Sequence, residues 1–127
     1  TASSKFSYMH IDTFRDYCLA KAGVTEETPF GPDTLVFKVM GKIFALTGMD
    51  RIPWGINLKC DPERAMELRE KYNSVQPGYH MNKKHWNTIH PEEGELSDKE
   101  LNELINHSYE LVVASLPKKL REELAEL

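Results

Sequence analysis

The sequence predicts an α+β domain in which helices pack on one face of an antiparallel sheet, a two-layer arrangement. Two segments, residues 35–47 and 56–60, are rich in β-branched and aromatic residues and alternate between apolar and polar positions, as strands with one buried face do. A third segment, residues 97–112, repeats its apolar residues at intervals of three and four, which is typical of an amphipathic helix. We expect this helix to cover the apolar face of the sheet.

Length and composition limit the chain to one domain. At 127 residues, 40% of them hydrophobic, it can form one sizeable core, and we expect residues 9–127 to do so, with residues 1–8 as an added leader or a disordered native arm. The apolar runs are short and broken by charge, so no membrane-spanning helix or signal peptide is predicted and the expected location is the cytoplasm. Cys18 and Cys60 lie far apart, which favours two reduced, buried thiols over a disulfide framework.

The first element is a helix over residues 10–23, where Ile11, Phe14, Cys18 and their apolar neighbours recur at helical spacing before Gly23. Residues 25–33 contain two prolines and a glycine, and we interpret them as a turn-rich connection.

A β-hairpin follows. Residues 35–40 and 43–47 are strand-like runs separated by Gly41-Lys42, and glycine at the first loop position suits a type II′ turn. This turn would pair Met40 with Ile43 and Lys38 with Ala45, because residues pair outward from the loop. The apolar residues on one face of the hairpin would then be Phe37, Val39, Phe44 and Leu46, with Lys38 on the other face.

Alternation also predicts the later strands, and capping signals predict the later helices. Residues 56–60 form a strand that puts Asn57 and Lys59 on its polar side, and residues 84–89 form another in which Trp86 and Thr88 face away from His85 and Asn87. A helix starts at Asp61-Pro62, a capping box at residues 97–100 opens the long helix, and a short helix follows Pro117.

The densest group of polar and aromatic side chains lies in residues 77–90, which hold three histidines, two lysines, two asparagines and two aromatic residues. Aromatic rings offer stacking faces, lysines contact phosphates, and amides form paired hydrogen bonds, so this mixture suits nucleic acid or a nucleotide-like anion. Together with basic residues of the polar sheet face, the candidate nucleic-acid-binding residues are Lys38, Lys59, Tyr79, His80, Asn82, Lys83, Lys84, His85, Trp86 and Asn87. Alternatively, Trp86 packs in the core and the lysines only keep an exposed sheet from aggregating.

Charge is unevenly distributed along the chain. The net charge is −4, which argues against a protein that coats nucleic acid through bulk charge. Residues 35–90 nevertheless hold nine basic and five acidic residues, whereas the rest of the chain holds seven and fifteen. The basic middle fits a local binding surface, although acidic helices that serve solubility would give the same pattern.

Other chemistry has weaker support. His80, His85 and His90 are five residues apart, so neighbouring members would alternate between the faces of a strand and would not converge on a metal ion. No nucleophile or phosphate-binding loop accompanies these histidines, and we therefore expect a non-catalytic protein without a cofactor.

Three motifs resemble the MmcQ/YjbR family over residues 9 to about 125. They are Leu35-Val-Phe-Lys-Val-Met-Gly-Lys-Ile-Phe-Ala45, Pro77-Gly-Tyr-His-Met-Asn-Lys-Lys-His-Trp86 and Ile105-Asn-His-Ser-Tyr-Glu-Leu-Val112. The resemblance implies a frataxin-like (CyaY-like) α+β fold and the DNA-binding role proposed for the family from its two-winged appearance. It would place DNA contacts at Tyr79, His80, Asn82, Lys83, His85 and Trp86.

Two other functions remain open. The frataxin-like fold implies iron or another cation held by acidic residues, here Asp12, Asp16, Glu26 and Glu27, although these carboxylates are scattered. A protein-interaction module is the other alternative, and an exposed apolar stripe at Leu120, Leu124 and Leu127 would favour it.

Overall fold

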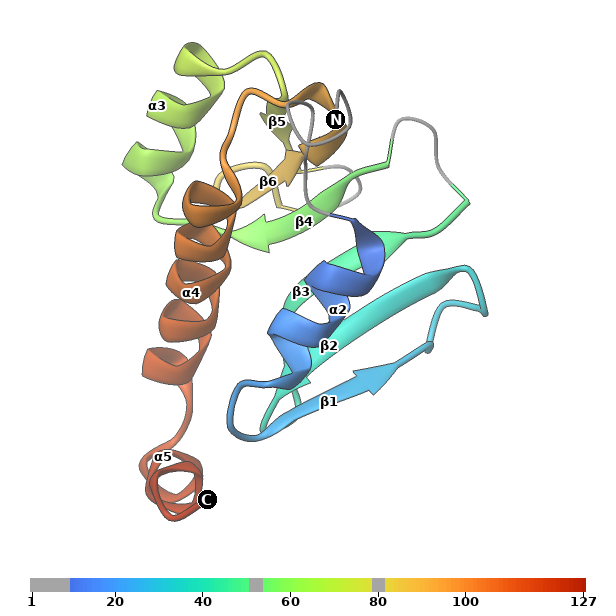
Figure 1. Cartoon of the computed structure of the whole chain (residues 1–127). Coiled ribbons are helices and arrows are strands. Elements are labelled where there is room, and N and C mark those ends of the chain that lie inside the picture. The colour runs from blue at the N-terminus through green and yellow to red at the C-terminus, as the bar shows by residue number, and fades with distance from the viewer. Residues whose placement is uncertain (1–9, 51–53, 79–81) are drawn as a thin grey trace.

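The computed structural model describes residues 10–50, 54–78 and 82–127, and these form two layers, a sheet and the helices on one of its faces (Figure 1). The sheet is antiparallel and six-stranded, which confirms the predicted α+β class. Its strands, in spatial order, are β1 (Val24–Glu27), β2 (Thr34–Val39), β3 (Lys42–Gly48), β4 (Ile56–Lys59), β6 (Trp86–Ile89) and β5 (Val75–Pro77). The leader expected at residues 1–8 lies outside the described residues.

The helices divide the covered face of the sheet between them. In Figure 1, α2 (Ile11–Leu19) lies over the β1–β2 side and α4 (Asp98–Ser115) crosses β3 and β4. The helix α3 (Pro62–Lys71) packs at the β5 edge, and α5 (Lys118–Ala125) follows α4 at the C-terminal end. A short 3-10 helix, η1 (Pro91–Glu93), leads from β6 towards α4. The predicted caps are present, because Asp61 accepts from the backbone N–H of Arg64 and Ser97 and Glu100 form a capping box.

Aromatic and aliphatic side chains from both layers form the core. The Phe14 ring of α2 meets Phe37 of β2 edge-on at 5.4 Å and Trp54 at 6.1 Å between ring centroids. The predicted stripe of α4 covers the strands, and four of its apolar residues are fully or almost fully buried: Leu101, Leu104, Ile105 and Val112. Both cysteines are free and buried, as expected.

The hairpin of β2 and β3 differs from its predicted register. Val39 pairs with Lys42, so the loop consists of Met40 and Gly41, and both have positive φ, at 49° and 88°. Two consecutive residues with positive φ form a type I′ turn, not the expected type II′ turn. The pairing then shifts between Phe37 and Lys38, since Lys38 lies opposite Ile43 and Phe37 opposite Ala45.

That shift is a β-bulge at Phe44, and it changes which residues face the core. Phe44 and Ala45 are consecutive, yet both are fully buried in the core. Beyond the bulge, Leu46 pairs with Val36 on the face away from the helices and is only partly buried. The prediction that Leu46 shares the core face was therefore wrong, whereas Phe37, Val39 and Phe44 do lie in the core.

Two short strands were not predicted. Residues 25–33, interpreted as a connection, begin with β1, whose polar sequence Val-Thr-Glu-Glu lacks an apolar alternation. The strand β5 has only three residues. Both β1 and β5 lie at the edges of the sheet. The expected strand at 84–89 starts later, at Trp86, because residues 83–85 form a turn.

Candidate nucleic-acid interface

The outer face of the sheet, which points away from the helices, brings Lys59 and Trp86 together. These residues are direct partners on β4 and β6, and Asn57 and Thr88 are the next pair on the same face. The opposite orientation of their neighbours is clear from Leu58, which is buried in the core beneath α4. The alternation predicted for both strands is therefore confirmed, and a lysine and an indole ring share one corner of the sheet.

The bulge in β3 fixes the end of β4 that carries Lys59. The Ser108 hydroxyl of α4 accepts the backbone N–H of Lys59 at 2.9 Å and donates to the carbonyl of Phe44. These two backbone groups lie where the β3–β4 ladder ends, beyond the Ala45–Leu58 pair. The Ser108 hydroxyl thus binds the two backbone groups that the bulge leaves without strand partners. These bonds keep the backbone of Lys59 aligned with the sheet.

A tight turn before β6 presents Lys83 and Lys84. The side-chain oxygen of Asn82 accepts the backbone N–H of Lys84 at 2.9 Å, and the Asn82 backbone carbonyl accepts the N–H groups of His85 and Trp86. Asparagine side chains stabilise turns in this way. Asn82 therefore shapes the turn, while both lysines are exposed on it.

Arg69 of α3 ties this turn to the helical layer. Its guanidinium donates to the Asn87 carboxamide at 2.7 Å, to the Trp86 carbonyl at 3.2 Å and to the Lys83 carbonyl. Arg69 was not among the predicted site residues, although it lies one turn after the buried Ala65 and so on the face of α3 that meets the sheet.

Asn87 does not belong to the outer surface. It pairs with Leu58 on the covered face, is 1% exposed, and its amide donates to the carbonyl of Ala65 in α3. The structure therefore corrects its placement beside the candidate lysines: Asn87 is a buried, hydrogen-bonded residue that anchors α3 to β6.

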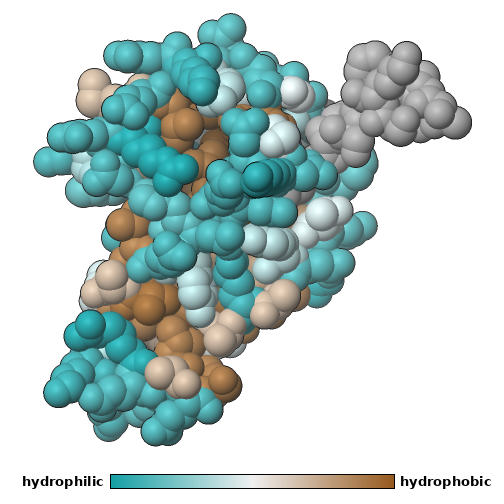
Figure 2. Space-filling view, turned by 60° about the vertical axis from the view of Figure 1, so that its left-hand side comes forward, coloured by the Kyte–Doolittle hydropathy of each residue, from teal (hydrophilic) through white to brown (hydrophobic). Residues whose placement is uncertain are grey.

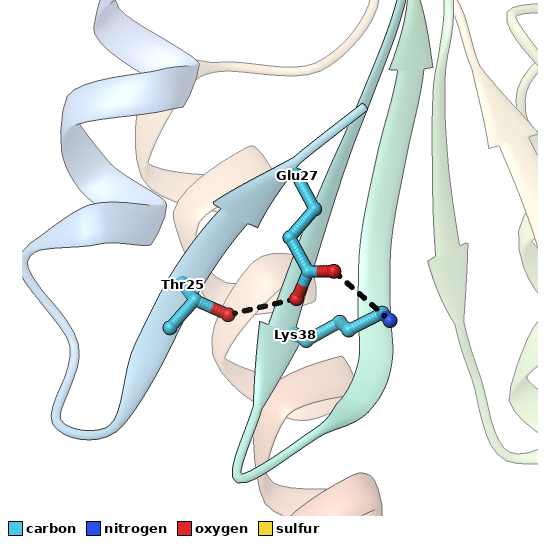
Figure 3. Close-up of polar contacts among 3 residues, drawn as sticks. All are labelled: Thr25, Glu27 and Lys38. Carbon is cyan, nitrogen blue, oxygen red and sulfur yellow. Dashed lines mark hydrogen bonds and ion pairs between the residues drawn. The ribbon is translucent and has the colours of Figure 1, made fainter. Parts of the chain in front are cut away.

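Lys38 is separated from this corner. It lies on the outer face of β2, two strands from β4, so its backbone is about 10 Å from that of Lys59 at the usual strand spacing. Its ammonium group pairs with Glu27 of β1 at 3.3 Å, and Thr25 donates to the same carboxylate (Figure 3). Lys38 is therefore partly neutralised by its neighbours.

Trp86 is held against the backbone of Gly78. The Gly78 N–H donates to the Trp86 carbonyl at 2.8 Å, and a Cβ atom at position 78 would approach the Trp86 Cβ to 2.7 Å. The indole is partly buried, and the residue is absent from the core cluster. Trp86 therefore lies on the outer face of the sheet and not in the core, which were the two alternatives that the sequence left open.

The middle of the outer face is less open than a flat polar platform. Val36, Asn57 and Thr88 lie in one cross-strand row, and they are 0%, 8% and 8% exposed. The Thr88 hydroxyl donates to the Asn57 carboxamide, so these polar groups bind each other. The accessible candidates therefore gather at one corner.

We use the name basic corner for Lys59, Lys83, Lys84 and Trp86, and His85 is the last residue of the turn that precedes Trp86. The backbone joins them, since the Cys60 N–H donates to the His85 carbonyl at 2.7 Å and so extends the β4–β6 pairing. Among the described residues, the ammonium groups of Lys59, Lys83 and Lys84 form no ion pair. Tyr79 and His80, also predicted as contacts, lie outside the described residues.

The acidic residues of the cation-binding alternative are partly occupied. Glu26 pairs with Arg15 at 2.6 Å, and Glu27 pairs with Lys38. Asp12 and Asp16 are exposed on α2. Within the part of the chain that the structure describes, no three acidic, histidine or cysteine residues converge as metal ligands.

The thiols are poor nucleophiles. Burial raises the pKa of the Cys18 thiol to about 12 and that of Cys60 to about 11, so both are protonated near neutral pH.

The C-terminal apolar stripe is largely used inside the protein. Leu124 is 9% exposed and approaches Gly23, Leu120 packs against the core, and Leu127 is 76% exposed. In the space-filling view, apolar atoms gather just above the lowest lobe, which is α5 (Figure 2).

No helix among the described residues is long and apolar enough to span a membrane.

Comparisons with known protein sequences identify relatives of this chain. The YjbR family model matches residues 19–111. The uncharacterized protein YbdF of Escherichia coli O157:H7 is 50% identical over 72% of this chain and 74% of its own length, and the uncharacterized protein YjbR of E. coli K12 is 32% identical over 94% and 100%.

Two solved structures have a fold similar to that of this chain. The crystal structure of Deinococcus radiodurans protein DR2400, a DUF419 domain, matches with a TM-score of 0.82 and 40% identity over 91% of this chain and 87% of that chain. A crystal structure of a Pseudomonas syringae protein matches with a TM-score of 0.70 and 34% identity over 81% and 98%.

Proposed function

The chain belongs to the YjbR family, and from the basic corner we propose that it is a non-catalytic protein that binds nucleic acid, with DNA as the first ligand to test. The observation that supports this proposal is the pairing of Lys59 with Trp86 on adjacent strands, beside the exposed Lys83 and Lys84. An indole face can stack on a base while ammonium groups contact the phosphates on either side of it.

The charge environment favours an anionic ligand at this corner. Its three lysines lack ion-pair partners among the described residues, whereas Lys38 has Glu27. An ammonium group that is not already in an ion pair can bind phosphate without first breaking one. The protein as a whole carries −4, so the attraction would be local and would weaken as salt shortens the range of the interaction.

The proposal can be tested by removing the two turn lysines together. Lys83→Ala with Lys84→Ala should weaken binding to short DNA of any sequence and reduce the slope of log affinity against log salt by about one unit per lost phosphate contact. Both side chains are exposed, so the midpoint of thermal unfolding should stay nearly constant. Fluorescence anisotropy at several salt concentrations measures the affinity and the slope.

Lys118 and Lys119 provide a matched control. They are also adjacent and exposed, but they lie on α5. Lys118→Ala with Lys119→Ala removes the same charge and should leave the salt slope unchanged. Equal effects of the two double variants would indicate attraction by overall charge and would contradict a defined interface.

A further inference from the structure

A groove lies beside the basic corner, between the beginning of α3 and the turn that carries the lysines. Its volume is about 370 Å³, and it is lined by Pro62, Glu63, Met66, Arg69, Lys83 and Lys84. This volume is at the small end of the range for small-molecule sites. The groove therefore has room for a single flat ring system, and Lys83 and Lys84 line it as well as the basic corner.

The groove combines three kinds of chemistry. Met66 is 60% exposed and so offers a polarisable apolar surface to a ring. Lys83 and Lys84 supply positive charge on one wall. Glu63 supplies a carboxylate at the α3 end, where an isolated phosphate would be repelled but an amino group could donate to it.

Arg69 also lines the groove, but within the described residues its guanidinium is already hydrogen-bonded, unlike the lysine ammonium groups. Its guanidinium already donates to Asn87 and to the carbonyls of Lys83 and Trp86. It fixes the distance between α3 and the turn, and so it sets the width of the groove. The lysine ammonium groups, which form no ion pair among the described residues, supply the charge that a ligand would meet.

We propose that the groove receives one unpaired nucleobase that carries an exocyclic amino group, with Lys83 and Lys84 on the adjoining phosphates. The base lies on Met66, and its amino group donates to Glu63. This inference rests on the proposed function and narrows it to single-stranded nucleic acid, because the amino edge of a paired base is already hydrogen-bonded and its faces are stacked.

Cytosine and thymine give the sharpest comparison, because they are pyrimidines of nearly equal size. Cytosine has an amino donor at the position where thymine has a carbonyl acceptor. A carboxylate therefore attracts the first and repels the second. We expect a ten-residue oligo-dC to bind about fivefold or more tightly than oligo-dT, and more tightly than a duplex of the same length, at equal salt.

The experiment measures anisotropy of labelled oligo-dC, oligo-dT and a ten-base-pair duplex at pH 7.5 with the full chain and four variants. Glu63→Ala should bring the ratio of oligo-dC to oligo-dT affinity close to one. This ratio is the informative quantity, because loss of a negative charge should strengthen binding of both strands. Glu67→Ala is the matched control, since Glu67 is an exposed acid one turn later on α3 and does not line the groove.

Met66→Ala tests the apolar surface, with Met49→Ala as its control. Met49 is also exposed, at 43%, but it lies in the β3–β4 connection. Met66→Ala should weaken oligo-dC binding while Met49→Ala leaves it unchanged.

Failure of this inference can be distinguished from failure of the proposed function. Equal affinity for oligo-dC and oligo-dT, tighter duplex binding, or no effect of Met66→Ala would overturn the base-binding groove. In those cases a flattened salt slope in the double lysine variant would still support the basic corner. Absence of salt-dependent binding to all three nucleic acids would overturn both proposals.

Discussion

At the scale of single residues, Arg69 connects the helical layer to the candidate interface. One guanidinium serves a buried carboxamide and two backbone carbonyls of the segment that leads into β6. The planar, fixed geometry of arginine allows several such bonds at once, whereas lysine has one ammonium centre. The position of Lys83 and Trp86 therefore depends on a residue that contacts no ligand in the proposal for the basic corner.

We expect Arg69→Lys to destabilise the protein by about 1–3 kcal/mol, because the Asn87 oxygen is then buried without its partner. Urea unfolding measures the change. Arg121→Lys on exposed α5 is the control and should alter stability by less than about 0.5 kcal/mol. A stability of the Arg69 variant equal to that of the control would mean that the guanidinium bonds do not hold the turn.

At the scale of elements, the sequence was sufficient where a pattern is local. The helix starts at Asp61 and Ser97 depend on a cap a few residues away, and they were predicted correctly. The alternation of residues 56–59 also predicted that Lys59 faces outward. Each of these features follows from interactions within one helix turn or along one strand.

The features that were not predicted depend on contacts between residues far apart in the sequence. The bulge at Phe44 requires Ser108, 64 residues later, to bind the carbonyl that the strand ladder leaves unpaired. Asn87 looked like a surface amide because its partners, Ala65 and Arg69, belong to another element. Part of the candidate site was therefore predictable from local pattern, but the burial of Asn87 and the groove with α3 were not.

The packing of β5 on β6 leads to a second prediction. Gly78 has no room for a side chain, because an added Cβ would lie 2.7 Å from the Trp86 Cβ and 2.9 Å from the Trp86 carbonyl oxygen. Gly78→Ala should therefore displace Trp86, shift its indole resonance in NMR spectra and weaken nucleic-acid binding. Gln76→Ala, at an exposed position in β5 two residues before Gly78, is the control and should do neither. An unmoved indole signal in the Gly78 variant would contradict this packing.

At the scale of the whole molecule, acid-sensitive contacts lie along α4 and at the starts of α3 and β5. His107 of α4 accepts the backbone N–H of Asp61 at 3.2 Å, which requires a neutral ring nitrogen. Burial, with a further contribution from Arg64, lowers the His107 pKa below 6.5, despite the opposing effect of Asp61 and Glu110. Hydrogen bonds from Ser74 to Glu95 and from Ser97 to Glu100 lower the pKa values of both carboxyls.

These shifts all reduce stability in acid. A histidine with a lowered pKa binds protons less well when folded, so stability falls as the pH drops below about 6.5, the value of the unfolded chain. The two carboxylates contribute stability above about pH 4.5, and this contribution is lost as the pH falls through their lower folded-state values. Two separate ranges of acid sensitivity therefore follow, one from the histidine and one from the carboxylates.

Two variants should separate these ranges in urea unfolding measured from pH 2.5 to pH 7. In His107→Gln the amide oxygen can still accept the Asp61 N–H but cannot be protonated, so the decrease that begins near pH 6.5 should become shallower. In Glu95→Gln the decrease below pH 4.5 should become shallower while the upper range stays as in the original protein. If His107→Gln keeps the pH dependence of the original protein, the α4 contact with Asp61 is not what makes the fold sensitive to mild acid.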